Sequence, residues 1–556
     1  MSNNNDKKHQ NDRRHVPVVI VGAGPNGLTL ANLLGTYGIE TLVLEKNLTT
    51  VQLPRAVSID DESMRTMQMI GLDQEVINQC AQDYGSVYLD VNRKPFARIE
   101  PNTSEYGFAR RNAFIQPNLE ATLKEGLKRF SCVETRFGHE VVNFSQDDQG
   151  VLLEVEDHDG HRYEIMADHV AASDGGKSYF RTTLNIPLEG LTYEQKWLII
   201  DLKGTGDNFR QTRVYCDPRR PGINLPGPDG TRRFEFMMLP GETEEQVVEE
   251  AFVRRLIADH GPDRDAEIVR KQVYHFHARE AVCWRKGRIF LVGDAAHLTP
   301  PFAGQGMNSG IRDASNLGWK LAQVVQGKLP AEVLDSYEEE RKPHAWQLIK
   351  MADILGRFMM PPTLLRARLM QAGMRVLSLY PPARDYVTQM RYKPKPRFMS
   401  GWFIPDGLSA KKTRAGRMMA QPALEDPQRR VAKLDDCCAA GFLLVAYGTS
   451  AAEAFAPLND WKHQLPADIQ RVCITPRQYN PVPDSDVQVF RDLYGQANEW
   501  IFDGFENAVF LVRPDRYVMA VLTAENAARV IPKLQSMFCK TEAGEIGVGV
   551  MTQSAA

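Results

Sequence analysis

The stretch that most constrains the fold of this chain is residues 16–46, VPVVIVGAGPNGLTLANLLGTYGIETLVLEK. An apolar strand runs directly into a glycine-rich turn, and a segment rich in Leu and Ala then reaches Tyr37. A second apolar strand, Thr41 to Leu44, ends on an acid, Glu45. The pattern predicts a strand, a tight turn, a helix and a parallel strand.

Each residue of this turn has a physical task in dinucleotide binding. Gly22 permits the tight turn, Gly24 lets the backbone approach a pyrophosphate, and Gly27 lets the helix lie close to the strand. The positive end of the helix then faces the phosphates. Glu45 lies 23 positions after Gly22, where its carboxylate can accept hydrogen bonds from a ribose. The segment predicts a dinucleotide site.

Composition sets the outer limits. A chain of 556 residues predicts two to four domains, and a net charge of −3 argues against a nucleic-acid partner. Residues 1–15 are polar, which predicts a disordered tail without a signal peptide. No run reaches the ~18 apolar residues of a membrane span. We therefore expect a cytoplasmic protein that makes no membrane contact.

The eight cysteines are scattered and form no CxxC pair, although Cys437 and Cys438 are adjacent. Reduced thiols are the expected state, and no metal site is predicted.

Two polar residues after the first strand pair are candidate cofactor ligands. Arg55, in a loop with Pro54, could pair with a pyrophosphate or could brace the loop. Gln116 lies at the mouth of a helix, where it could bind a polyol or satisfy loop backbone.

Further candidates follow apolar strands, whose carboxyl ends form the ligand-binding edge of an open α/β sheet. Asp174 follows the strand that ends at Ser173, and Gly293 and Asp294 follow the strand over 288–292. Gly306 opens a long predicted helix whose first N–H groups would face an anion or an electron-rich ring edge. Two strand-end glycine sites far apart in sequence suit one long dinucleotide lying across the sheet.

Residues 185–280 change to strand-like runs, which predict a sheet-rich module inserted in the nucleotide domain. Arg232 and Arg233 are adjacent in one of these strands, so at most one can face the cofactor. An arginine there would suit a carboxylate-bearing ligand.

The motifs resemble the three fingerprints of the single-component FAD-dependent aromatic hydroxylases, in order and spacing from Val16 to about Leu321. The fingerprints are GAGPNG with Glu45, Asp174-Gly175, and GDAAH at 293–297 followed by Pro-Pro and Gly-Met-Asn. The stretches PRAVSIDDESMRTMQ, RRNAFIQP, RRFEFMMLPGETEEQ and MNSGIRDASNLGWKLA most closely resemble members that act on 3-(3-hydroxyphenyl)propionate.

The resemblance implies an α/β fold, bound FAD, and NADH or NADPH as a transient reductant. It implies ortho-hydroxylation of a small phenol by O₂ through a flavin C4a-hydroperoxide. Pro301 matches a proline whose carbonyl lies near the phenol. The cofactor-binding positions are Gly22, Gly24, Gly27, Glu45, Arg55, Gln116, Asp174, Gly293, Asp294, Gly306, Met307 and Asn308.

Two further roles are hypotheses. His277 or a backbone carbonyl activates the phenol, although His277 could equally pack within the module or face solvent. Arg233 is the candidate for the substrate carboxylate.

The expected domains are a Rossmann-like FAD-binding domain over 16–184 and 281–380, the substrate domain over 185–280, a proline-rich linker over 381–399 and a thioredoxin-like domain over 400–556. A homodimer is possible. Three alternatives stay open: a hydroxylase of another phenol or hydroxybenzoate, a non-hydroxylating FAD oxidoreductase, and a flavin-binding sensor.

Overall fold

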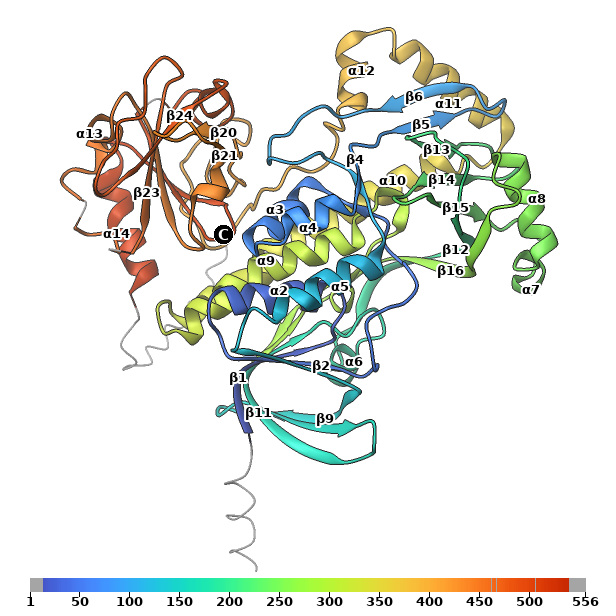
Figure 1. The fold of residues 1–556 in the computed structure, drawn as a ribbon, viewed down its shortest axis with the longest axis horizontal. Helices are drawn as coiled ribbons and strands as arrows, with labels where there is room; N and C mark the ends of the chain where they lie inside the picture. The colour runs from blue at the N-terminus through green and yellow to red at the C-terminus, as the bar shows by residue number, and fades with distance from the viewer. Residues whose placement is uncertain (1–13, 462, 467, 506, 540–556) are drawn as a thin grey trace, which may run out of the picture.

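The computed structural model describes residues 14–461, 463–466, 468–505 and 507–539. The expected tail over 1–15 lies outside them, except for Arg14 and His15, which open the first strand. Figure 1 shows the nucleotide-binding domain at the centre, a second sheet on the right and the C-terminal domain on the left.

The first sheet contains the predicted strand–turn–helix–strand unit. Strand β1 pairs in parallel with β2 and with β11, and helices α2, α5 and α9 lie over the sheet. The sheet order is β17-β18-β11-β1-β2-β8, and β9 and β10 extend it through β11. The strands are β1 Arg14–Val21, β2 Thr41–Glu45, β8 Val133–Phe137, β9 His139–Gln146, β10 Val151–Asp157, β11 Arg162–Ala172, β17 Arg285–Lys286 and β18 Ile289–Leu291. The helices are α2 Pro25–Thr36, α5 Gln116–Leu127, α6 Tyr179–Thr183 and α9 Gly306–Val325. The parallel pairs bring the ends of β1, β11 and β18 to one edge, where the three predicted fingerprints meet.

A small three-stranded sheet and two helices cover this edge. The strands are β3 Ser58–Ile59, β7 Asn112–Ala113 and β4 Ala81–Gln82, and the helices are α3 Asp61–Met69 and α4 Asp73–Asn78. Helix α3 begins at Asp61 because the Asp60 carboxylate accepts a hydrogen bond from Ser63 N at 3.0 Å.

The second sheet has the order β19-β16-β12-β15-β14-β13-β5-β6. Most of it comes from the predicted substrate module, but β5 and β6 come from residues 86–99, which the sequence had assigned to the FAD domain. Strand β5 joins by parallel pairing with β13, a long-range contact that no local pattern reveals. The strands are β5 Ser86–Leu89, β6 Pro95–Ile99, β12 Leu188–Lys203, β13 Thr212–Tyr215, β14 Gly222–Pro226, β15 Thr231–Met237, β16 Glu267–Ala281 and β19 His297–Leu298.

The two faces of this sheet pack against different partners. Leu198, Phe234 and Phe236 face helices α7 Glu244–Val247 and α8 Glu250–His260. Trp197 and Phe276 face the opposite side, toward the nucleotide-binding domain. This second face is the one near the candidate site.

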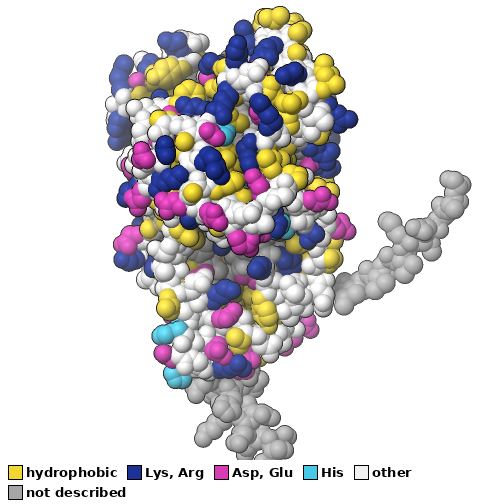
Figure 2. Space-filling view, turned by 90° about the vertical axis from the view of Figure 1, so that its right-hand side faces the viewer, with side chains coloured by type: hydrophobic (Ala, Val, Ile, Leu, Met, Phe, Trp, Pro, Cys, Tyr) yellow, Lys and Arg dark blue, Asp and Glu magenta, His cyan; other side chains and the backbone are white. Residues whose placement is uncertain are grey.

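Helices follow the last fingerprint, as predicted. After α9 come α10 Ser336–Met359, α11 Leu364–Leu377 and α12 Pro381–Thr388. Helix α12 lies in the first half of the expected linker, because Pro381 and Pro382 occupy a first helical turn, where the missing N–H costs no hydrogen bond. Figure 2 shows hydrophobic and basic side chains intermixed over the upper part of this side of the molecule.

The C-terminal domain is built on a seven-stranded mixed sheet with the order β21-β20-β24-β23-β22-β25-β26. The strands are β20 Ala423–Glu425, β21 Val431–Lys433, β22 Leu443–Tyr447, β23 Gln470–Thr475, β24 Gln488–Asp492, β25 Val509–Val512 and β26 Val518–Leu522. Helices α13 Ala451–Ala454 and α14 Ala527–Phe538 accompany them. Burial raises the pKa of Cys437 to about 11 and that of Cys438 to about 12, so both thiols are protonated at neutral pH. The thioredoxin-like assignment stays a prediction.

A buried carboxylate joins this domain to the nucleotide-binding domain. Glu340 on α10 accepts hydrogen bonds from Arg513 Nη1 at 2.5 Å and Nη2 at 2.9 Å, and from Lys320 Nζ at 2.7 Å. Asp515 also pairs with Arg513, and the four side chains are at most 1 % exposed. The domains therefore share one buried ionic junction. Among the described residues, no helix combines the length and the apolar composition needed to cross a bilayer.

Candidate cofactor and substrate site

The first glycine turn is packed on two sides and open on the third. Gly22 has φ +107°, and a Cβ there would lie 2.3 Å from Ser173 O. A Cβ on Gly27 would lie 2.0 Å from Gly22 O. By contrast, a Cβ on Gly24 would meet no atom within 4 Å. The two packed glycines shape the turn, and Gly24 borders open space in front of α2.

Helix α2 begins at this opening without a side-chain cap, so its first N–H groups are available to an anion. Glu45 helps to hold the loop, because its Oε2 accepts from Ala23 N and its Oε1 from Asn47 N, at 2.8 and 2.9 Å. A carboxylate has about four acceptor positions, so Glu45 retains capacity for a ribose.

The structure gives Gln116 the loop-bracing alternative. Its Oε1 accepts hydrogen bonds from the backbone N of Arg55 and of Ala56, both at 2.8 Å. Its Nε2 donates to Glu120 Oε1 at 2.8 Å, which holds the amide in this orientation. The Arg55 side chain is exposed and close enough to Asp294 to influence its pKa. Gln116 therefore positions the backbone from which Arg55 projects.

Asp174 has a structural contact and an unused oxygen. Its Oδ2 accepts from Tyr179 N at 2.7 Å and from Phe180 N at 3.3 Å, at the start of α6. Its Oδ1 is buried and, within the described chain, has no hydrogen-bond partner. Burial raises the pKa of this carboxyl. Such an unpaired buried oxygen is unfavourable unless a ligand satisfies it.

Gly293 and Asp294 form the second strand-end site, in the short turn η1 Gly293–Ala295. Gly293 has φ +62°, and a Cβ there would lie 2.1 Å from Asn26 Nδ2. Glycine is required here because the two fingerprints pack directly against each other. Desolvation raises the pKa of Asp294, and the nearby His297 and Arg55 reduce that shift.

His297 packs beneath this site. It is fully buried, and its Nε2 lies 2.7 Å from Asp313 Oδ2. Burial alone would lower its pKa, but the Asp313 carboxylate dominates and raises it. Because Arg341 Nε also donates to Asp313, at 2.9 Å, His297 belongs to an internal network.

The start of α9 is the third open element. A Cβ on Gly306 would meet nothing within 4 Å, and the helix has no side-chain cap. The Asn308 side chain fixes this end: its Oδ1 accepts from Asp60 N at 3.0 Å, and its Nδ2 donates to Ser58 O at 2.9 Å. Met307 is half-buried beside it. The free N–H groups of this helix end face the opening at a defined angle.

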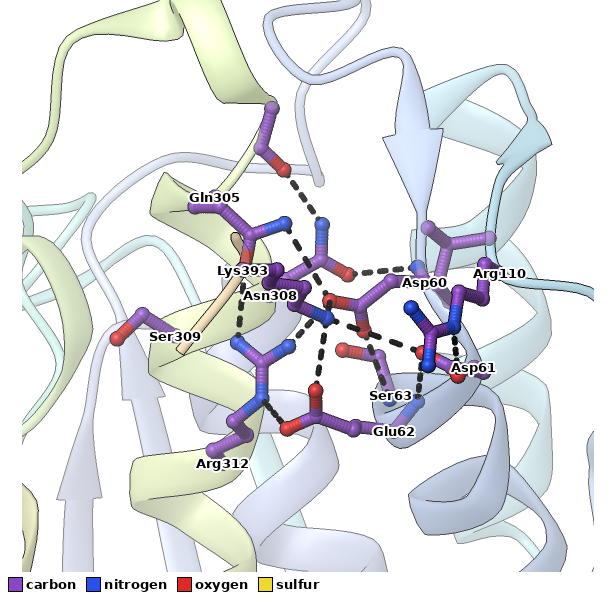
Figure 3. Close-up of polar contacts among 12 residues, drawn as sticks. Asp60, Asp61, Glu62, Ser63, Arg110, Gln305, Asn308, Ser309, Arg312 and Lys393 are labelled. Atoms are coloured by element: carbon purple, nitrogen blue, oxygen red, sulfur yellow. Dashed lines mark hydrogen bonds and ion pairs between the residues drawn. The ribbon is translucent and has the colours of Figure 1, made fainter. Parts of the chain in front are cut away.

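Behind Asn308 lies a group of charges that the sequence analysis did not single out (Figure 3). This buried charge cluster consists of Asp60, Asp61, Glu62, Arg110, Arg312 and Lys393. Arg312 Nε donates to Glu62 Oε2 at 2.6 Å, and Lys393 Nζ donates to Glu62 Oε1 at 2.7 Å. The three carboxylates lie close enough together to ligate a cation, but Arg312 and Lys393 supply the positive charge.

The cluster holds carboxylates in different protonation states. Burial would raise the pKa of Asp60 and Glu62, but Arg312 and Lys393 lower both below their usual range. For Asp61, burial dominates and raises the pKa. The run Asp60-Asp61-Glu62 at a helix start was visible in the sequence, but its partners come from residues 110, 312 and 393, far along the chain.

Pro301, in η2 Pro301–Ala303, leads into aromatic side chains of the second sheet. Phe302 lies 5.7 Å, centroid to centroid, from both Trp197 and Phe276, which stack on each other. A second triad consists of Tyr88, Phe96 and Phe358, with separations of 5.8–6.3 Å. We call these six residues the aromatic cluster.

Arg233 faces the side of the sheet that the sequence allowed, but its charge is already paired. Its Nε donates to Asp201 Oδ1 at 2.6 Å. Its other nitrogens donate to Arg55 O and Pro54 O, each at 2.6 Å. The proposed substrate-carboxylate role is therefore corrected: Arg233 supports the loop that carries Arg55.

His277 lies on the wrong face for the predicted role. Phe276 packs in the aromatic cluster, so its strand neighbours His275 and His277 face the opposite side. His277 Nδ1 lies 3.0 Å from Thr192 Oγ1 on β12. Burial, Arg279 and His275 lower its pKa. This placement directs the imidazole away from Phe302, and the catalytic hypothesis is withdrawn.

Together these openings fit FAD. Two uncapped helix starts, the open space at Gly24 and the unpaired Asp174 oxygen lie along the edge where β1, β11 and β18 end. This edge offers N–H donors for phosphates and for a flavin ring, and carboxylates for hydroxyl groups.

Comparison with known proteins agrees with this assignment. Residues 15–352 match the FAD binding domain family, and residues 416–537 match the HcaD C-terminal domain. The chain is 36% identical to the 3-(3-hydroxy-phenyl)propionate/3-hydroxycinnamic acid hydroxylase of Comamonas testosteroni, covering 95% of this chain and 98% of that protein. It is 39% identical to the protein of the same name from Burkholderia cenocepacia (strain HI2424), covering 95% and 97%.

Solved structures share the fold. The flavin-dependent monooxygenase PieE, in complex with FAD and substrate, superposes with a TM-score of 0.77 at 22% identity, covering 94% of this chain and 98% of that chain. Aklavinone-11 hydroxylase with FAD and aklavinone gives 0.74 at 23% identity, covering 95% and 99%. From the fingerprint geometry and the full-length similarity, this chain belongs to the family of FAD-dependent aromatic hydroxylases.

Proposed function

We propose that this enzyme hydroxylates 3-(3-hydroxyphenyl)propionate at the ring carbon ortho to its hydroxyl, giving 3-(2,3-dihydroxyphenyl)propionate. One oxygen atom of O₂ enters the ring, the other leaves as water, and NADH is oxidised to NAD⁺. The observation that carries the proposal is 36–39% identity, over 95% of this chain, to proteins named for this activity. NADH as reductant, a cytoplasmic location and a homodimer stay predictions.

The cofactor-binding edge would hold FAD along its whole length. The N–H groups of α2 and the backbone at Gly24 would contact the pyrophosphate, and Glu45 the adenosine ribose. Asp294 would accept from ribityl hydroxyls. Bound FAD supplies hydride acceptance from NADH and activation of O₂.

The start of α9 would control charge at the flavin ring. Backbone N–H groups at Met307 and Asn308 would donate to its pyrimidine edge and stabilise the negative charge of the reduced ring. Asn308 is held by Asp60 N and Ser58 O, so these donors are oriented before the reaction. Preorganised donors of this kind need no rearrangement when charge develops.

The aromatic cluster would receive the substrate ring and exclude water. Phe302, Trp197 and Phe276 present an apolar wall next to Pro301. A hydrogen bond from the phenol to the Pro301 carbonyl would make the ring more electron-rich, since an unperturbed phenol with a pKa of ~10 stays protonated at neutral pH. Exclusion of water prevents wasteful loss of reduced oxygen as H₂O₂.

Stopped-flow reduction of the FAD-loaded enzyme by NADH tests the proposal. We expect much faster flavin reduction with 3-(3-hydroxyphenyl)propionate than without it, and one dihydroxy product per NADH. A panel of phenols and hydroxybenzoates, scored by product, ranks the alternatives. NADH oxidation without any hydroxylated product would identify a non-hydroxylating oxidoreductase. A bound flavin that NADH does not reduce would identify a sensor.

A further inference from the structure

Two adjacent arginines before β7 have different surroundings. Arg110 lies 3.8 Å from an Asp61 oxygen and 3.9 Å from a Glu105 oxygen. Arg111 places its guanidinium 4.4 Å from the centroid of the Tyr84 ring and donates to Ser86 Oγ. Among the described residues, no carboxylate lies within ion-pair distance of Arg111. This cation therefore has unused donors, since guanidinium carries five N–H groups.

Two tyrosine hydroxyls lie within the electrostatic reach of Arg111. Burial raises the pKa of Tyr88, and Arg111 partly offsets that shift. Burial likewise raises the pKa of Tyr392 to about 12, again against a lowering by Arg111. In the described part of the chain, neither hydroxyl has a hydrogen-bond partner. One guanidinium and two phenol groups thus point to a missing acceptor, because buried donors are normally satisfied.

These three side chains adjoin the proposed substrate position. Tyr88 belongs to the aromatic cluster and lies 5.8 Å from Phe358. Two residues before Phe358 on α10, Gly356 packs so closely on Phe302 that a Cβ would lie 2.5 Å from its ring. The apolar surface therefore continues from Phe302, next to Pro301, to Tyr88 and Arg111.

Tyr392 links the same position to the flavin side. It directly precedes Lys393 of the buried charge cluster, and that cluster contacts Asn308 through Asp60. The donors thus lie between the aromatic cluster and the segment that orients the start of α9. A ligand with an aromatic ring at one end and an anion at the other would match this order of surfaces.

We propose that Arg111, assisted by the hydroxyls of Tyr88 and Tyr392, binds the carboxylate of the aromatic substrate. The planar guanidinium can hold a carboxylate with two parallel hydrogen bonds, and its neighbours can donate one each. This inference rests on the proposed function and assigns its carboxylate specificity to Arg111 in place of Arg233. Arg111 is a binding residue that fixes the distance between the carboxylate and the reacting ring.

The test compares two ligands that differ in the carboxylate: 3-(3-hydroxyphenyl)propionate and 3-ethylphenol. Each is titrated anaerobically, without NADH, into FAD-loaded enzyme, and Kd is read from the flavin absorbance. In Arg111→Met we expect Kd for the acid to rise about 10- to 100-fold, the range for hydrogen bonds to a charged group. Kd for 3-ethylphenol should stay within about 2-fold of wild type.

Three further variants keep the test sharp. Arg111→Lys retains the charge without the planar fork, so we expect a smaller loss. Tyr392→Phe should weaken only the acid, by about 3- to 10-fold. Arg213→Met is the matched control, because Arg213 also lies over an aromatic ring, 4.2 Å from the Phe209 centroid, but is paired with Asp207. It should change neither Kd.

The outcomes separate the inference from the function. If wild type converts the acid but Arg111→Met and Arg111→Lys keep its Kd, the carboxylate assignment is wrong. Equal weakening of both ligands would also overturn it, since that pattern indicates general damage to the pocket. If wild-type enzyme neither binds nor hydroxylates the acid, the proposed function itself fails, and the carboxylate assignment fails with it.

Discussion

At Gly24, one hydrogen atom in place of a side chain leaves the start of α2 accessible. Because a Cβ there meets nothing within 4 Å, Gly24→Val should fold normally and yet fill the space proposed for the pyrophosphate. We expect the FAD Kd to rise by about 10-fold or more, with the melting temperature of the FAD-free protein unchanged.

Flavin fluorescence quenching measures this Kd. Gly206→Val is the control, because Gly206 also has no atom within 4 Å of a Cβ and lies in an exposed loop. Unchanged FAD affinity in Gly24→Val would contradict the placement of the pyrophosphate.

Glu235 gives the second prediction at this scale. Burial raises its pKa to about 7, against the lowering effect of Arg233. Because the folded pKa lies above the unfolded value, its contribution to stability is complete below pH ~4.3 and is lost as the pH rises through 7. Glu235→Gln removes this titration, so relative to wild type the variant should gain up to about 3 kcal/mol between pH 5 and pH 8.

Urea unfolding of both proteins at the two pH values measures this difference. A parallel pH dependence in wild type and variant would show that Glu235 does not titrate as described.

At the scale of elements, Lys393 joins the segment after α12 to the start of α3. It contacts Asp60, Asp61 and Glu62, so Lys393→Met would leave three buried carboxylates with less compensating charge. We expect a loss of about 3–5 kcal/mol in the free energy of unfolding, the cost of breaking a buried ionic group.

Adding Asp61→Asn to Lys393→Met should recover part of that loss, because one fewer carboxylate then needs a partner. Denaturant unfolding monitored by circular dichroism tests both variants. A single variant as stable as wild type would mean that Lys393 contributes no net stabilisation.

Local patterns predicted the elements whose chemistry is local. The glycine turn at 22–27, the strand ends before Asp174 and Asp294 and the start of α9 lie where the sequence places them, because each depends on a few consecutive residues. The addition of β5 to the second sheet and the pairing of Arg233 with Asp201 depend on residues far apart in sequence. Strand alternation correctly separated His277 from Tyr274, but it could not show which face meets Phe302.

At the scale of the whole molecule, the Glu340 junction should make the two large parts unfold together. Arg513→Met removes the main partner of a fully buried carboxylate, at an expected cost of about 3–5 kcal/mol. We expect calorimetry to show one melting transition in wild type and an additional, earlier one in the variant.

Arg471→Met on β23 is the control, because this half-buried arginine lies in the same domain away from Glu340. Limited proteolysis should release a C-terminal fragment from Arg513→Met but not from the control. A single unshifted transition in Arg513→Met would contradict the coupling.

The same junction sets an order of events during synthesis. Arg513 follows Glu340 by 173 residues, so at ribosomal rates of about 5–20 residues per second it emerges on the order of ten to thirty seconds later. Until then, Glu340 and Lys320 have only each other and their local neighbours. The FAD-binding half of the nascent chain therefore acquires its last buried counter-charge only when translation is almost complete.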